Sequence, residues 1–447
     1  MTELNVLSAL FGGKMVRKEL KVPSSRFSRA TKLGGLFAKV ASNIAVNGTK
    51  QFVGGQKPTF SDLLLTPSNL QKLANELASM RGAAMKLGQL LSMDAGEFLS
   101  PELSQILATL RDNAYAMPHK QLVSILSDEW GKDWVNNFAY FNLKAFACAS
   151  IGQVHIAHDD SGKKLAVKLQ YPGVKDAIES DVANLGRILK VSGLIPKQVD
   201  LDTLLNKTAE QLANEANYIR EAHYIDLFEK QLDSTCFALP KVHDLSNVNI
   251  LVMSFIKGMP IEQTAELPPS VKNHITENLF SLFFNELFNL RLMQTDPNFA
   301  NYVYDDNTQT IGLLDFGATR EISADISSGY LALFKALYLE DKDQIERAAR
   351  DIGFFKQHID VEYLDKIIDL FKIASQPIRF NGEYDFSTCD IASILRIESQ
   401  NINKQKDQWH TPPVDALFIH RKIAGLYLIA KRLNAKVNVQ KLLLPYL

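Results

Sequence analysis

Two short stretches decide how this sequence folds. They are Thr295-Asp-Pro-Asn-Phe-Ala-Asn301 and, after an apolar strand, Leu313-Leu-Asp-Phe-Gly317. An asparagine stands five residues after Asp296 in the first, and Asp315 directly follows the strand in the second. Carboxylate and amide oxygens are the hard ligands that Mg²⁺ prefers. Asp-Phe-Gly alone is a common tripeptide, and an acid and a turn after a buried strand would be the simpler interpretation of it. The residues upstream decide between the two interpretations.

A lysine on a strand and a glutamate on a helix precede these stretches. Leu165-Ala-Val-Lys168 ends a strand that follows a hairpin signal, Asp159-Asp-Ser-Gly162. A lysine on the buried side of a sheet needs a carboxylate, because burial without a partner favours its neutral form. Glu221, 53 residues further on in a helical stretch, is the candidate partner. Lysine, glutamate, aspartate, asparagine and aspartate, in this order and on these elements, are the arrangement of the protein-kinase fold.

Periodicity divides the rest of the chain into helical and strand-rich parts. Apolar residues at three- and four-residue steps predict helices over 61–135 and 174–232, and short Val, Ile and Leu runs predict strands over 144–170. Further expected elements are strands around 240–243 and 249–253, a hinge at 254–258, a helix over 271–293, two strands flanking 305–308, and helices throughout after Ile322.

The predicted fold class is therefore α+β, a protein-kinase-like two-lobed fold with an N-terminal helical extension. We expect a basic peripheral arm over 1–60 and the helical extension over 61–135. A small antiparallel-sheet N-lobe is expected over 136–255 and a helical C-lobe over 256–447. Ordinary protein kinases carry Ala-Pro-Glu after Asp-Phe-Gly to anchor a peptide-docking segment. No proline occurs between Asn298 and Gln376, so a platform for protein substrates is not expected.

The loop expected to cover a nucleotide departs from that of ordinary kinases. Phe146–His155 reads Phe-Ala-Cys-Ala-Ser-Ile-Gly-Gln-Val-His and keeps only Gly152, where ordinary kinases use three glycines. Alanine does not adopt a positive φ cheaply. The loop is therefore predicted to hold nucleotide differently, and loss of phosphoryl transfer to proteins is one consequence.

These segments together resemble the UbiB-type, or aarF-domain, atypical kinases, most closely the members tied to coenzyme Q biosynthesis. The resemblance runs from about residue 22 to the C-terminus. It rests on the following motifs: Lys86-Leu-Gly-Gln89, the loop Ala147–His155, Lys168-Leu-Gln-Tyr-Pro-Gly173, Glu215 with Arg220-Glu-Ala222, Asp296-Pro-Asn with Asn301, and Asp315-Phe-Gly-Ala-Thr-Arg320.

The resemblance implies a role for each motif. Lys168 would pair with Glu221 and with the α- and β-phosphates of ATP or ADP. Asn301 and Asp315 would ligate Mg²⁺, and Asp296 would occupy the position of the catalytic base. The nucleotide-binding loop would comprise Ala147, Cys148, Ala149, Ser150 and Gln153. Lys86 and Gln89, one helical turn apart, would lie on a helix that covers the active site where a protein substrate would dock, with Glu215 and Asn217 meeting that helix.

Three departures from the family pattern stand out. The usual Glu-x-Asp motif reads Glu215-Ala-Asn217, which weakens a charge contact with Lys86 but keeps an acceptor. Cys148 replaces a loop alanine; it would tune nucleotide affinity or offer a thiol, although a small core-like residue is the simpler interpretation. Gln294-Thr295 replaces the His-Gly of many bacterial members, which fits the coenzyme Q subgroup.

Composition and charge set limits on the class of protein. The 447 residues contain 49 Lys and Arg against 50 Asp and Glu, a formal net charge of −1, and ordinary globular proportions exclude a disordered, collagen-like or coiled-coil chain. A nucleic-acid partner is not expected, because base-reading motifs and a strongly basic chain are absent. Three scattered cysteines, at 148, 236 and 389, predict neither a disulfide framework nor a zinc site.

The charge is unevenly distributed. Residues 1–60 carry ten basic against two acidic side chains, a local charge of +8, so the remainder carries −9. Within this arm, Leu33–Ala45 suits either an interfacial helix on anionic lipid or a solvated basic arm packed on the same protein. The longest apolar run, Ile423–Ala430 between two lysines, is far too short to span a bilayer.

The leading hypothesis is an ATP-binding, Mg²⁺-dependent atypical kinase or ATPase that supports ubiquinone biosynthesis at a membrane surface and is not a protein kinase. The alternatives are a small-molecule or lipid kinase acting on an isoprenoid or prenyl-phenol alcohol, and a nucleotide-gated lipid-binding scaffold without turnover. Expected partners are ATP, anionic lipid and other quinone-biosynthesis proteins. The expected location is the cytoplasmic face of the inner membrane in a bacterium, or the matrix face of the mitochondrial inner membrane.

Overall fold

The computed structural model describes residues 116–149, 151–192, 201–355, 360–402 and 413–447. The expected basic arm and most of the helical extension, with Lys86 and Gln89, lie outside the described residues, as does Ser150. Two compact units divide the chain. The N-terminal unit consists of the chain up to Asp226 together with Pro240–Phe255, and the C-terminal unit of Leu227–Leu239 together with Ile256–Leu447.

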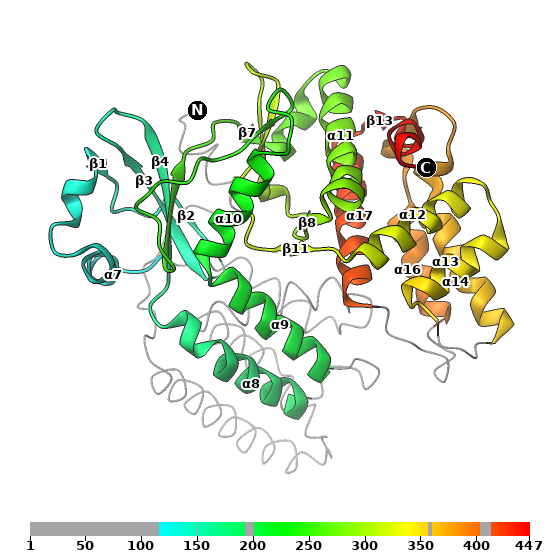
Figure 1. The fold of residues 1–447 in the computed structure, drawn as a ribbon, viewed down its shortest axis with the longest axis horizontal. Helices are drawn as coiled ribbons and strands as arrows, with labels where there is room; N and C mark the ends of the chain where they lie inside the picture. Colours follow the sequence, from blue (N-terminus) through cyan, green and yellow to red (C-terminus); the bar gives the residue numbers. More distant parts are fainter. Residues whose placement is uncertain (1–115, 150, 193–200, 356–359, 403–412) are drawn as a thin grey trace, which may run out of the picture. The chain divides into compact units, whose positions relative to one another are not determined.

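An antiparallel sheet organises the N-terminal unit. Its strands lie in the order β1-β3-β4-β6, with β2 paired to the other part of β3 (Figure 1). The strands are β1 (Tyr140–Phe141), β2 (Ala147–Cys148), β3 (Gly152–His158), β4 (Lys164–Gln170) and β6 (Ile250–Ser254). Strands β3 and β4 form the hairpin predicted around Asp159–Gly162, in which the Asp159 carboxylate accepts hydrogen bonds from the backbone N–H groups of Ser161 and Lys163. The small antiparallel sheet predicted for this part of the chain is confirmed.

The helices around this sheet differ from the single long helical stretch expected over 174–232. The structure has α7 (His119–Trp130), the short η1 (Trp134–Asn137), α8 (Val174–Ser192), α9 (Leu201–Glu215) and α10 (Tyr218–Glu229). Helices α8 and α9 pack side by side, as Figure 1 shows. Asn217 separates α9 from α10, because its side chain accepts a hydrogen bond from the Arg220 N–H and so begins a new helix.

Short strands in the C-terminal unit carry the two stretches that decided the fold. One sheet has the order β5-β10-β9-β7, and a second pairs β8 with β11. The strands are β5 (Phe237–Ala238), β7 (Met259–Pro260), β8 (Leu292–Gln294), β9 (Tyr302–Asp305), β10 (Thr310–Leu313) and β11 (Thr319–Glu321). The strands predicted on either side of 305–308 are confirmed. The strand expected around 240–243 is wrong: Val242 forms only an isolated bridge, and the strand is β5, which pairs in parallel with β10.

Helices make up most of the C-terminal unit (Figure 1). They are η2 (Ile261–Glu266), α11 (Pro269–Phe284), η3 (Asn285–Leu290), η4 (Phe299–Asn301), α12 (Ala324–Tyr338), α13 (Lys342–Ile352), α14 (Val361–Ala374), α15 (Gln376–Arg379), η5 (Phe386–Thr388), α16 (Ile391–Ile402), α17 (Val414–Leu433), α18 (Val439–Leu443) and η7 (Leu444–Tyr446). Helices α12, α13 and α14 begin at side-chain caps, where Ser323, Asp341 and Asp360 accept backbone N–H groups. Helix α13 ends at Gly353, whose φ of 98° suits glycine.

Two sequence-based expectations are met only in part in this unit. The helix expected over 271–293 is confirmed as α11 and its continuation, the π-helical turn η3, up to Leu290, and only its last residues belong to strand β8. The stretch after Ile322 is not wholly helical, because β12 (Tyr384–Asp385) pairs with β13 (Lys436–Val437). Strand β8, with three residues, and strands β12 and β13, with two residues each, are too short for an alternating pattern to show in the sequence. The sheet and the helices together confirm the predicted α+β class.

No helix in the described part of the chain combines the length and the apolar character that crossing a bilayer would need.

Candidate functional site

A buried ion pair joins Lys168 and Glu221 in the N-terminal unit. Lys168 lies on β4, with its backbone opposite Val154 of β3 and Leu251 of β6, and Glu221 lies in the first turn of α10. The Lys168 Nζ donates to both carboxylate oxygens of Glu221, at 2.8 and 2.9 Å. The side chains are 9% and 1% exposed. A pair buried to this degree is costly to desolvate and needs bidentate geometry of this kind to persist.

The alanine-rich loop is a tight hairpin next to this pair. Ala147 and Cys148 lie buried on β2, opposite Val154 and Gln153 of β3, and Ala149 donates its N–H to the Gly152 carbonyl at 2.8 Å. None of the described residues of this loop has a positive φ. Gly152 is instead required by close packing, because a Cβ there would overlap the Leu169 carbonyl and lie 3.0 Å from the Tyr218 hydroxyl.

The Gln153 side chain, predicted to contact nucleotide, takes part in a buried network. Its Oε1 accepts the Met117 N–H at 2.9 Å, and its Nε2 lies 2.8 Å from His155 Nε2. The His155 Nδ1 lies 2.8 Å from the Asn142 carbonyl, which can only accept, so Nδ1 carries the proton and Nε2 accepts from Gln153. Burial lowers the pKa of His155 to about 4, which keeps the ring neutral. His155 therefore has a structural role.

Glu215 and Asn217 flank the break between α9 and α10. Glu215 accepts a hydrogen bond from Gln211 at 3.4 Å, and Asn217 accepts the Arg220 N–H at 3.2 Å. The Asn217 carbonyl also accepts the N–H of Glu221. The position where the family usually has an aspartate therefore begins the helix that carries Glu221. The contact expected between these residues and the helix of Lys86 and Gln89 lies outside the described residues and stays a prediction.

In the C-terminal unit, Asn301 holds the loop that begins at Asp296. The Asn301 Nδ2 donates to the Asp296 carbonyl at 3.0 Å, and the Leu314 N–H donates to the Asn301 carbonyl at 3.0 Å. Asn298 caps the short helix η4 between them. The five-residue spacing is thus explained by Asn301, whose side-chain amide closes the loop and whose backbone carbonyl ties the loop to the strand leading to Asp315.

Asn301 and Asp315 line the same small cavity of the C-terminal unit. Because the Asn301 amide nitrogen is used in closing the loop, its Oδ1 is the atom available as a ligand. Asp315 Oδ1 accepts the Gly317 N–H at 2.9 Å, which orients the carboxylate. Mg²⁺ is usually held by one or two protein oxygens together with phosphate oxygens and water. These two residues fit that requirement, and the described residues contain no cluster of three or more His, Cys, Asp or Glu side chains that would hold a metal alone.

Sequence reasoning did not find a buried arginine next to Asp296. Arg421, on α17, donates from Nη2 to Asp296 Oδ1 at 2.7 Å, and its side chain is 5% exposed. The Nε and Nη1 atoms of Arg421 are buried and have no hydrogen-bond partner among the described residues. A buried guanidinium with unused donors is suited to oxyanions.

The next residue on α17 makes a second buried contact. Lys422 and Glu286 are each 1% exposed, with Nζ 3.1 Å from Oε2, and Lys422 also donates to the Gln294 carbonyl at 2.8 Å. Burial raises the pKa of Glu286. Burial alone would lower the pKa of Lys422, but attraction to Glu286 and Tyr302 raises it above its usual value. Lys422 seemed in the sequence only to bound an apolar run. The sequence did contain a signal for this pair, namely a lysine within an otherwise apolar helix. A lysine buried in such a helix requires a carboxylate partner.

Arg320, the last residue of the motif that begins at Asp315, could by its position either approach phosphate or form a structural ion pair. Its Nε lies 3.8 Å from Asp415 Oδ1, and its guanidinium lies over the Phe418 ring at 4.7 Å. Both partners belong to α17, so this geometry shows a structural contact between β11 and α17.

Comparison with known proteins places this geometry in a family. Residues 109–349 match the model of the ABC1 atypical kinase-like domain. Atypical kinase COQ8B, mitochondrial, of Rattus norvegicus is 34% identical over 429 residues, which cover 95% of this chain and 81% of that protein. Atypical kinase COQ8, mitochondrial, of Saccharomyces cerevisiae is 34% identical over 427 residues, 95% of this chain and 85% of that protein. The chain therefore belongs to the ABC1 atypical kinase-like family. Within it, the chain falls in the UbiB-type subgroup of the COQ8 kinases, which confirms the resemblance found in the sequence.

A solved structure agrees on the fold. The complex of Rv3197 with erythromycin from Mycobacterium tuberculosis has a TM-score of 0.57 to this chain at 23% identity, and the match covers 85% of this chain and 96% of that one. At this identity the match shows the fold alone. The match to the ABC1 atypical kinase-like domain confirms the kinase-like fold that the sequence predicted from Lys168, Glu221, Asp296, Asn301 and Asp315. The roles of these residues stay predictions.

Proposed function

We propose that this chain is an ATP-binding, Mg²⁺-dependent kinase-like ATPase that supports ubiquinone biosynthesis. The observation that carries the proposal is the bidentate pair of Lys168 with Glu221, because a buried lysine held in this way can present its charge to nucleotide phosphates. Asn301 and Asp315, which line one cavity, are proposed to hold Mg²⁺. When bound, the metal would neutralise phosphate charge. The names of the COQ8 relatives support the assignment to coenzyme Q biosynthesis.

The chain's own residues would divide the work as follows. Lys168 would hold the α- and β-phosphates, and Glu221 would keep the lysine charged and oriented. The hairpin of Ala147, Cys148 and Ala149 would lie against the nucleotide through its backbone. Asp296 would orient the attacking group. Its side chain is 20% exposed, so part of the surrounding water is excluded from it.

Phosphate release from ATP by the purified full chain, with and without Mg²⁺, tests the proposal. We expect Lys168→Ala and Asp315→Asn to abolish release while circular dichroism stays that of the wild type. Lys163→Ala, in the turn between β3 and β4, and Asp306→Asn, in the turn between β9 and β10, change exposed residues. They are the matched controls and should keep full activity. Undiminished turnover in either site variant would overturn the proposal.

We further propose that the protein acts at a membrane surface, peripherally and through its basic N-terminal arm. The support is the local charge of +8 over residues 1–60, since clustered cations are attracted to anionic lipid. The relatives named mitochondrial favour the mitochondrial location over the bacterial one. Co-sedimentation with vesicles of anionic and of neutral lipid tests this. Binding to anionic vesicles should disappear on removal of residues 1–60, and equal binding to both kinds of vesicle would contradict the proposal.

A further inference from the structure

Helix α17 meets the loop that begins at Asp296 through a glycine. A Cβ atom at Gly425 would overlap Cβ of Pro297, the residue after Asp296, and lie 2.5 Å from its Cγ. Carbon atoms in contact are roughly 3.5–4.0 Å apart. The φ of Gly425 is not positive, so the helix itself does not need a glycine here, and glycine lowers helix propensity. The close approach to Pro297 is therefore the reason for Gly425.

The same face of α17 holds the loop by two further contacts. Arg421, one turn before Gly425, donates to Asp296 Oδ1 at 2.7 Å, and Lys422 donates to the carbonyl of the last residue of β8 at 2.8 Å. Residues at steps of three and four lie on one face of a helix. The loop is therefore fixed to α17 at the end of β8, at Asp296 and at Pro297.

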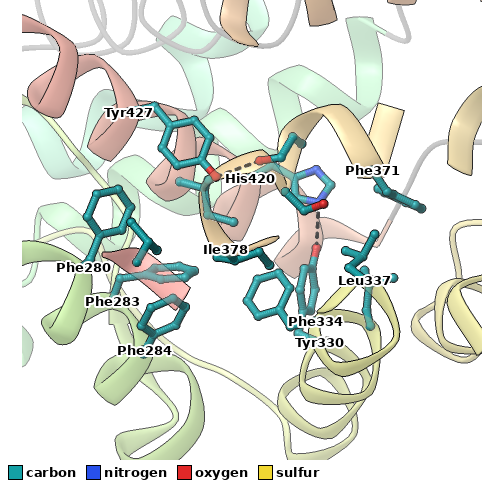
Figure 2. Close-up of a pocket in the computed structure, with 15 residues that line it drawn as sticks. Phe280, Phe283, Phe284, Tyr330, Phe334, Leu337, Phe371, Ile378, His420 and Tyr427 are labelled. Atoms are coloured by element: carbon teal, nitrogen blue, oxygen red, sulfur yellow. Dashed lines mark hydrogen bonds between the residues drawn. The ribbon is translucent and has the colours of Figure 1, made fainter. Parts of the chain in front are cut away.

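The opposite face of α17 is anchored in the aromatic core of the C-terminal unit. His420 Nε2 lies 3.0 Å from the Tyr330 hydroxyl, and the Tyr427 hydroxyl donates to the Ala374 carbonyl at 2.7 Å (Figure 2). Both side chains extend from α17 among rings contributed by α11 and α12. A closely packed core transmits a displacement rather than absorbing it. An atom added at Gly425 therefore cannot push α17 away and would displace the loop instead.

We propose that Gly425 is a positioning residue, whose missing side chain lets α17 hold Asp296 where it orients the attacking group. This role rests on the proposed ATPase function, in which Asp296 orients that group. Moving Pro297 Cγ from 2.5 Å to a contact distance of roughly 3.5 Å would displace the loop by about 1 Å. A displacement of about 1 Å can cost about a hundredfold in rate. Gly425 acts through Pro297 and Asp296 and not by contact with a substrate.

Steady-state phosphate release from ATP by the purified full chain tests the proposal. Gly425→Ala should lower kcat by about ten- to a hundredfold. The Kd for ATP should change by less than about twofold, because the phosphates are proposed to be held by Lys168 and the metal, and a loss confined to kcat indicates positioning. Gly329→Ala is the matched control. Its new methyl group would lie 2.7 Å from Ile352 Cγ1, between α12 and α13, and kcat should stay that of the wild type.

A second-site change tests whether Gly425 acts through Pro297. Pro297→Gly removes the ring atoms that the new methyl group would meet. The double variant Gly425→Ala/Pro297→Gly should therefore turn over at least about tenfold faster than the product of the two single losses predicts. If Gly425→Ala does not fold, circular dichroism should show a folded double variant, with the kcat of Pro297→Gly. Independent losses, or a double variant that is also unfolded, would show that Pro297 is not the partner of Gly425 and would contradict the proposal.

Amide hydrogen exchange provides a measurement that needs no turnover. In the peptide covering residues 296–301, exchange should be at least about tenfold faster in Gly425→Ala than in the wild type and unchanged in Gly329→Ala, because only the first variant displaces the loop. A wild-type kcat in Gly425→Ala, unchanged exchange in this peptide, or the same losses in Gly329→Ala would each refute the proposal. If the wild type releases no phosphate, the proposed ATPase function fails, and hydrogen exchange still decides whether Gly425 positions the loop.

Discussion

Arg421 Nη2 lies 2.7 Å from Asp296 Oδ1, in a contact between α17 and the loop after β8. Asp296 stands where the family resemblance places the catalytic base. One of its two oxygens is therefore held by a guanidinium that is 5% exposed. A carboxylate fixed in this way has a defined orientation, because the short bond to the guanidinium restricts its rotation. This arrangement suits the orientation of an attacking group, which is the role proposed for Asp296.

Arg421→Met should lower the kcat of ATP hydrolysis by about tenfold or more and change KM little, because Arg421 acts through Asp296. Arg421→Lys keeps the charge but not the planar fork and should restore part of the rate. Steady-state kinetics of phosphate release measure both. Arg432→Met, an exposed arginine on the same helix, is the control. A wild-type kcat in Arg421→Met would remove the positioning role.

Lys422→Met should destabilise the fold by about 3–5 kcal/mol, because it leaves Glu286 buried and unpaired. The double variant Lys422→Met/Glu286→Leu removes both charges and should recover most of that loss. Urea unfolding of the two single variants and the double variant measures the coupling between them. Additive losses would show that Lys422 and Glu286 do not depend on each other.

Lys168→Met should also destabilise the protein by about 3–5 kcal/mol through the unpaired Glu221. Here the double variant Lys168→Met/Glu221→Leu should recover stability but not ATP hydrolysis, because the phosphate contact is lost with the lysine. The contrast separates the structural cost of the pair from its function. Recovery of turnover in the double variant, measured by phosphate release, would refute a role for Lys168 at the phosphates.

Because His155 is buried in its neutral form, we expect the protein to lose stability in acid. Burial lowers the pKa of His155 to about 4 from the ordinary 6.5, so the unfolded state binds more protons between these values. The contribution of neutral His155 to the free energy of unfolding is complete above pH 6.5 and is lost as the pH falls towards 4. The loss amounts to about 3 kcal/mol over this pH range. Urea unfolding between pH 7 and pH 5 measures the slope.

His155→Gln should flatten this slope, and His158→Gln, on the same strand, should leave it unchanged. His420 has the same direction of shift in the C-terminal unit and should add a similar slope there. A slope in His155→Gln equal to that of the wild type would assign the acid sensitivity to other groups.

Local patterns predicted the elements whose signals lie within a few residues. The hairpin of β3 and β4 follows from alternation around Asp159–Gly162, and the strands β9 and β10 follow from the turn between them. The failures have a common cause. The π-helical turn after α11, the parallel strand β5 and the pair of β12 with β13 are each stabilised by distant segments, which leave little trace in local periodicity.

The sequence by itself determined the family and the kinase-like class, because motifs at characteristic spacings can be recognised without a structure. It also gave the order of the site residues, Lys168, Glu221, Asp296, Asn301 and Asp315. Only the tertiary structure decided which side chains these residues meet. Arg421 lies 125 residues from Asp296, and Lys422 lies 136 from Glu286. A cavity of the C-terminal unit likewise is lined by aromatic side chains from α11, α12 and α17, which are far apart in the sequence. Such contacts depend on how helices pack, and packing is decided by the whole chain rather than by any one stretch of it.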